Sequence, residues 1–71
     1  MNAETLDAAL LAAHEAGDRA ALIRLYMAAS EAAETPQAQS FYLTHAYVFA
    51  LEAGAPEAAD LRQRLRDMGA I

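Results

Sequence analysis

The chain has 71 residues, a formal net charge of −5 and 56% hydrophobic residues, a composition typical of one folded domain and not of a disordered segment. The absence of cysteine excludes disulfides, thiolate metal ligands and thiol nucleophiles. No apolar run approaches the ~20 residues that span a bilayer, and the N-terminus lacks the basic region of a signal peptide. We therefore expect a single acidic, cytoplasmic domain over residues 1–71, without membrane association.

Helix-forming and helix-capping residues alternate from the N-terminus onward. Alanine, the strongest helix former, accounts for 20 residues spread over the whole chain. Asn2 can cap a first helix over residues 3–16, which Gly17 ends in a left-handed conformation. Asp18 is then placed to cap a second helix over residues 19–34. The first half of the chain therefore predicts two helices joined by a very short turn.

The second half of the chain has the same kind of helix-capping and helix-ending residues. Thr35 followed by Pro36 combines an N-cap with a proline at the first helical position, where its missing N–H costs nothing. This pair predicts a third helix over residues 36–53, which Gly54 ends, and a fourth helix follows over residues 56–68. Because each connection has only one to three residues, neighbouring helices must run antiparallel. We therefore expect an all-α fold of four short antiparallel helices, arranged as two stacked helical hairpins.

Hydrophobic periodicity predicts which face of each helix is buried. The third segment is apolar on two opposite faces, which is typical of a central helix covered by its neighbours. The fourth segment is the most polar, which is typical of a helix that caps the end of an array. From the helical wheels, the expected core comprises Leu6, Leu10, Leu22, Leu25, Tyr26, Tyr42, Leu43, Ala46, Phe49, Ala50, Leu61 and Leu65.

An internal repeat accompanies the helical pattern. The tripeptide Glu-Ala-Gly at residues 15–17 recurs at residues 52–54, an offset of 37 residues, each time at the expected corner of a helical hairpin. A pair of alanines follows each corner, at residues 20–21 and 58–59. Repeat periods of this length are typical of helix–turn–helix arrays. The repeat therefore favours two related helical hairpins.

Small residues at Ala29 and Ala59, Tyr26 as the large residue of a second helix, and Pro36 after that helix complete the repeat pattern. Together with the glycine corners, they make residues 5–66 resemble two degenerate units of the tetratricopeptide-repeat superfamily. The first helices depart from the family pattern because they lack its tryptophan–leucine–glycine–tyrosine signature. The resemblance implies antiparallel helix pairs that bind peptides or proteins, and it transfers no specific ligand residue.

The two histidines are the candidates for a ligand-responsive role. His14 lies four residues before Asp18 and near Asp7, and His45 precedes Glu52 by two turns. No histidine pair has the i, i+4 spacing of a helical metal site, and neither position matches a metal motif. We therefore expect no metal and no cofactor, and we interpret His45 as a structural residue hydrogen-bonded to a neighbour. A small-ligand or metal-responsive regulator that uses His14 or His45 with nearby acids is the alternative function.

The sequence offers little for catalysis or for nucleic-acid binding. Its carboxylates are spread over all helices, no serine or threonine lies in a nucleophile elbow, and the three glycines are isolated instead of forming a phosphate loop. Arg62, Arg64 and Arg66 form the one basic cluster, but their spacing of two residues spreads them around a helix. A chain of net charge −5 repels phosphate backbones. We therefore expect neither an enzyme nor a nucleic-acid-binding protein.

Apolar residues outside the expected core indicate where a partner could bind. Ile23 and Met27 lie one turn apart on the polar side of the second helix, flanked by Arg19 and Arg24. Apolar side chains with a charged rim are the anatomy of a protein interface. We expect these four residues to bind a protein partner or a second copy of the chain, unless the helix is rotated so that Ile23 and Met27 close the core. The expected function is a non-catalytic protein-interaction module that self-associates or docks a partner helix or peptide.

Overall fold

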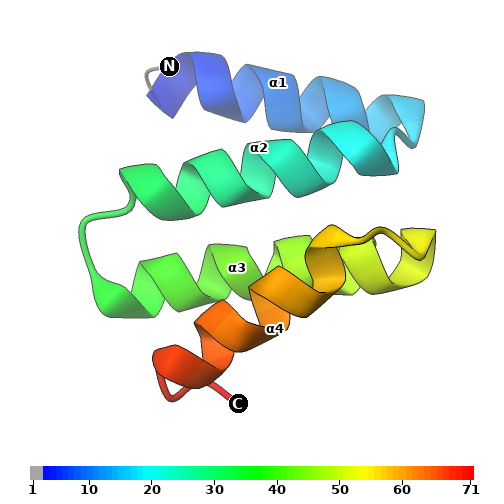
Figure 1. Ribbon diagram of the computed structural model, residues 1–71. Coiled ribbons are helices and arrows are strands. Elements are labelled where there is room, and N and C mark those ends of the chain that lie inside the picture. The colour runs from blue at the N-terminus through cyan, green and yellow to red at the C-terminus, as the bar shows by residue number, and fades with distance from the viewer. Residues whose placement is uncertain (1–2) are drawn as a thin grey trace.

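The computed structural model describes residues 3–71, which form four α-helices and no strand (Figure 1). The expected cap at Asn2 lies outside the described residues. The all-α fold predicted from the sequence is confirmed. The helices are α1 (Ala3–Ala16), α2 (Arg19–Ala32), α3 (Pro36–Ala53) and α4 (Glu57–Asp67).

Capping side chains begin the two central helices where the sequence places them. The Asp18 carboxylate accepts a hydrogen bond from the Ala21 backbone N–H at 3.1 Å, and the Thr35 hydroxyl accepts one from the Ala38 backbone N–H at 3.1 Å. Each bond satisfies a backbone donor that the first helical turn leaves without a partner. At the other end of α3, Gly54 adopts the left-handed conformation with φ 63°, which glycine takes without steric penalty.

Two helices are shorter than the sequence predicts. The second helix ends at Ala32 because Ala33 already has extended backbone angles, φ −69° and ψ 140°. The fourth helix begins one residue later than expected, with Pro56 as its N-cap, and ends at Asp67. These differences concern only the terminal residues of helices, where the hydrogen-bonded ladder frays.

The four helices form a flattened array in chain order. Figure 1 shows α1, α2 and α3 side by side and antiparallel, with α4 crossing α3 obliquely. Each helix packs on the next one along the chain, and the pair α2 and α3 shares the largest interface. The Cα atoms extend over 30 × 29 × 13 Å. The closest backbone contacts are thus between neighbours in the chain, and no second layer of helices covers the faces of the described array.

The core is built mainly where α2, α3 and α4 meet. Its largest fully enclosed side chains are Leu61 and Leu65 of α4, both 0% exposed. Although most residues of α4 are polar, these two leucines pack the helix against α2 and α3. The buried cluster consists of Ile23, Leu43, Ala46, Ala50, Leu61 and Leu65.

The expected core is wrong at several positions. Leu10, Leu25, Tyr26, Tyr42 and Phe49 are only partly buried, whereas the small residues Ala13 and Ala29 are buried between α1 and α2. Small side chains allow two helices to approach closely, so alanines can fill contacts that the helical wheels assigned to larger residues.

The third helix is central in the array but is not enclosed. Phe41, Val48 and Leu51 of α3 are about half exposed or more, at 57%, 47% and 56%. The second apolar face of this helix, which suggested burial on all sides, therefore lies at the surface. A flattened array covers a central helix along its two flanks only.

Side-chain hydrogen bonds hold α2 and α3 together near their connection. The Ser30 hydroxyl donates to the Gln39 backbone carbonyl at 2.9 Å, and the Gln39 amide donates to the Ala33 carbonyl at 3.2 Å. Within residues 4–71, Ser30 is the one polar residue that is buried. Its hydrogen bond satisfies the hydroxyl and fixes the α2–α3 pair, on which the surface described next is built.

Candidate functional site: an aromatic groove

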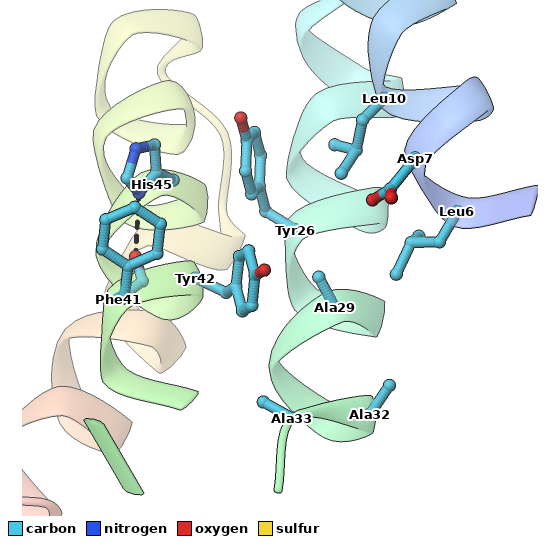
Figure 2. Close-up of a pocket in the computed structure, with 10 residues that line it drawn as sticks. All are labelled: Leu6, Asp7, Leu10, Tyr26, Ala29, Ala32, Ala33, Phe41, Tyr42 and His45. Atoms are coloured by element: carbon cyan, nitrogen blue, oxygen red, sulfur yellow. Dashed lines mark hydrogen bonds between the residues drawn. The ribbon is translucent and has the colours of Figure 1, made fainter. Parts of the chain in front are cut away.

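A groove runs over α2, between α1 on one side and α3 on the other (Figure 2). Its volume is about 440 Å³. We call it the aromatic groove, because four of its side chains carry rings and lie partly exposed. The lining residues are Leu6, Asp7 and Leu10 of α1, Tyr26, Ala29, Ala32 and Ala33 of α2, and Phe41, Tyr42 and His45 of α3.

The shape of the groove follows from the residues on α2. Ala29, Ala32 and Ala33 present only methyl groups, so they leave space between the flanking helices. Larger side chains come from both sides, and Figure 2 shows Asp7 and Leu10 of α1 directed toward α2. Because α2 contributes small alanines here and α3 contributes rings, a depression remains that larger side chains on α2 would fill.

Tyr26 lies at the centre of a ring cluster. Its ring is stacked on His45 at a centroid distance of 5.0 Å and on Phe49 at 5.8 Å. A third ring, Tyr42, lies at 6.3 Å in a tilted arrangement. Offset and edge contacts at these distances are the favourable geometries for aromatic pairs. These stacking contacts restrict the orientation of the Tyr26 ring.

The cluster extends to both walls of the groove. Phe41 approaches His45 at 4.5 Å and meets Tyr42 edge-on at 5.4 Å. On the α1 side, His14 meets both Tyr26 and Phe49 edge-on, at 5.9 Å each. Six rings from three helices are thus in one connected set, and 57% of Phe41 at its edge is exposed.

Both histidines have hydrogen-bond partners inside this set. The His14 Nε2 atom and the Tyr26 hydroxyl are 2.9 Å apart. His45 donates from Nδ1 to the Phe41 backbone carbonyl at 2.8 Å, because a carbonyl can only accept. In neutral His45 this bond leaves Nε2 as the acceptor nitrogen. The expected hydrogen bond of His45 to a neighbour is present, although the residue also lines the groove.

The charged residues around the groove are acidic. Asp7 is the one charged side chain among the lining residues. Along α3 the surface continues past Val48 to Glu52, which faces Arg19 at 4.0 Å across exposed side chains. Within residues 3–71, Asp7 forms no such ion pair, and Arg24 lines a different depression between α1 and α2. The groove therefore combines aromatic side chains with the negative charge of Asp7, which has no ion-pair partner among the described residues.

The interface expected around Ile23 is not a surface of the folded chain. Ile23 is 2% exposed and belongs to the buried cluster, and Met27 packs against that cluster. Arg19 and Arg24 are exposed, as expected, but they have no apolar anchor between them. The prediction of Arg19, Ile23, Arg24 and Met27 as a binding patch is therefore corrected, because α2 is rotated so that its Ile23 side faces α3 and α4.

The direct side-chain contacts of the two histidines are with rings. Within residues 3–71, no group of three histidine or carboxylate side chains is arranged to hold a metal ion. His14 contacts Tyr26 and Phe49, and His45 contacts Tyr26 and Phe41. Glu52 shares a depression on α3 with His45 and Phe49, but among the described residues neither Asp18 nor Glu52 forms a hydrogen bond or ion pair with a histidine.

The sequence carried a signal for this cluster that the helical wheels did not isolate. Phe41, His45 and Phe49 are spaced by four residues, which places three rings in a row on one side of a helix. Phe41 and Tyr42 are adjacent in the sequence and so point about 100° apart around a helix, yet their rings are in contact. The four-residue spacing of aromatic and histidine residues, considered apart from hydrophobicity, indicates the α3 part of the ring cluster.

Comparison of the chain with protein-family models, with curated proteins and with solved structures gives no match. The search for membrane spans along residues 3–71 finds no helix with the length and apolar character to cross a bilayer.

Proposed function

We propose that the chain is a non-catalytic protein-interaction module whose aromatic groove receives a helix or peptide of a protein partner. The observation that carries the proposal is the position of the ring cluster on a face without a second layer of helices. Domains normally bury such a face between two layers. A docked helix would supply the missing layer over the groove.

The composition of the groove supports this type of ligand. Rings with a polar edge, such as Tyr26 and Tyr42, are enriched in protein interfaces because they combine apolar area with a hydrogen-bonding group. They are held by stacking and packing, so little conformational entropy is lost when a partner covers them. The described residues contain no strand, so a partner cannot add to a sheet edge there, which leaves a helix or a peptide lying in the groove.

The resemblance of the sequence to helical-repeat units supports the same function, since such repeats bind peptides or proteins. The alternative regulator built on His14 or His45 has no corresponding support, because both side chains are engaged with rings. The proposed site is therefore the groove and not a histidine–carboxylate centre.

Selection from a displayed peptide library tests the proposal with two matched variants. Phe41→Ala removes an exposed ring at the groove, and Leu51→Ala removes an equally exposed apolar side chain of the same helix that does not line it. Peptides selected on the unmodified protein should bind Phe41→Ala about tenfold more weakly, a loss of ~1.4 kcal/mol that is usual for a hot-spot side chain. They should bind Leu51→Ala with unchanged affinity. Equal binding to all three proteins would place the interaction elsewhere and contradict the proposal.

A further inference from the structure

We infer that the occupant of the aromatic groove is a basic amphipathic helix of another protein, whose arginine side chains stack on the exposed rings and pair with Asp7. The inference rests on the proposed function and specifies the chemistry of its partner. It follows from three features of the groove: the sign of its charge, the exposure of its ring faces and the charge of the whole chain.

The first feature is the charge at the groove. Asp7 lines it, is exposed, and forms no ion pair with the described residues. No arginine lines the groove or its continuation along α3, where Glu52 is the one charged side chain. A cationic side chain entering the groove would therefore meet the negative charge of Asp7, whereas Glu52 along α3 already faces Arg19 at 4.0 Å.

The second feature is the ring surface on the α3 side of the groove, across α2 from Asp7. Phe41 is 57% exposed, and Tyr26, Tyr42 and His45 are partly exposed around it. A guanidinium placed over the face of a tyrosine or phenylalanine is attracted by the negative centre of the ring. Arginine fits this site better than lysine does, because its planar group can stack on a ring and still donate hydrogen bonds to a carboxylate.

The third feature disfavours a second copy of the chain as the partner. A second copy brings a net charge of −5, so the two molecules repel each other at long range. A basic partner is attracted instead, and its apolar residues can pack on Leu10, Ala32 and Ala33. An amphipathic helix with leucine and arginine on adjacent faces satisfies both parts of the groove.

Two synthetic peptides and two variants test the inference. The probe is a fluorescein-labelled amphipathic helix of about 18 residues, as long as α3, built from leucine, alanine and arginine. Its control carries citrulline, which has the shape of arginine without the charge, at each arginine position. The variants are Asp7→Asn, at the groove, and Asp67→Asn, which removes the same charge from exposed Asp67 at the far end of the chain and keeps an acceptor for Gln63.

Affinities from fluorescence anisotropy give the expected pattern. The arginine peptide should bind the unmodified protein about tenfold more tightly than the citrulline peptide. Asp7→Asn should weaken the arginine peptide about threefold, the effect of one solvent-accessible ion pair, and leave the citrulline peptide unchanged. Asp67→Asn should change neither affinity. Added salt should weaken the arginine peptide alone.

Each deviation has a defined meaning. Equal affinity for both peptides, with binding still lost in Phe41→Ala, would overturn the basic-partner inference and leave the proposed groove function standing. Equal weakening by Asp7→Asn and Asp67→Asn would show general charge attraction and would also overturn it. Failure of both peptides to bind, with a dimer in sedimentation that Phe41→Ala dissociates, would assign the groove to a second copy. Binding that is unaffected by Phe41→Ala would contradict the proposed function itself.

Discussion

At the scale of single residues, burial decides between the two roles that the sequence left open for Ile23. The side chain is 2% exposed among Leu43, Ala46 and Leu61, so it is a core residue. Ile23→Ala should lower the free energy of unfolding by about 2–5 kcal/mol, because the removed methyl groups leave a cavity in a close-packed region. Urea denaturation monitored by far-UV circular dichroism measures this loss.

Two variants calibrate the Ile23 measurement. Ile23→Val should lower the free energy of unfolding by only about 0.5–1.5 kcal/mol. Leu11→Ala, at a side chain 62% exposed, should stay within about 0.5 kcal/mol of the parent. If Ile23→Ala unfolded with the same midpoint as Leu11→Ala, the residue would not be in the core and the surface interpretation would be restored.

At the scale of helices, the sequence predicted the elements well and their faces poorly. Capping residues act locally, since the Asp18 and Thr35 side chains accept hydrogen bonds from the backbone three residues ahead. Their effect can therefore be predicted from the adjacent residues in the sequence. Which side of α2 is buried depends on the position of α3 and α4. In a helix that is rich in alanine, several faces are nearly equally apolar, so the periodicity alone did not place Ile23 in the core.

The fourth helix tests how far a polar-looking element supports the fold. Leu61 and Leu65 are completely buried, and burying one leucine contributes about 1.5–3 kcal/mol. A domain of this size has a total stability near the lower end of ~5–15 kcal/mol. A chain truncated after Gly54 should therefore lose its cooperative thermal transition, which calorimetry detects. A sharp transition in the truncated chain would mean that α1, α2 and α3 hold their own core and that α4 is dispensable.

At the scale of the whole molecule, the aromatic groove is a property of packing that no single segment displays. Its rings come from three helices, and Tyr26 connects His14 of α1 with His45 of α3. Each ring is visible in the sequence, but their meeting depends on the order and rotation of the helices in the array. The flattened array that brings the rings together also leaves them uncovered. A ligand that covers the rings should therefore also stabilise the folded state.

This link gives a prediction for the thermal stability of the complex. A ligand that binds only the folded state at a concentration one hundred times its Kd stabilises it by about 2.7 kcal/mol. In a domain of this size such a gain should raise Tm by about 10–20 °C. The arginine peptide should produce this rise in the unmodified protein, measured by circular dichroism at a fixed peptide concentration. A complex that adds the missing layer should also unfold in one transition.

The Phe41→Ala variant separates stabilisation through the groove from general charge effects. Its Tm without peptide should stay close to that of the parent, because the lost side chain is 57% exposed and alanine is the better helix former. At the same peptide concentration its Tm should rise by several degrees less, since a tenfold weaker Kd removes about 1.4 kcal/mol of the stabilisation. An equal rise in both proteins would show that the peptide stabilises the acidic chain without entering the groove. A smaller rise in Phe41→Ala, with an unchanged rise in Leu51→Ala, assigns the gain in stability to the ring cluster that the array leaves uncovered.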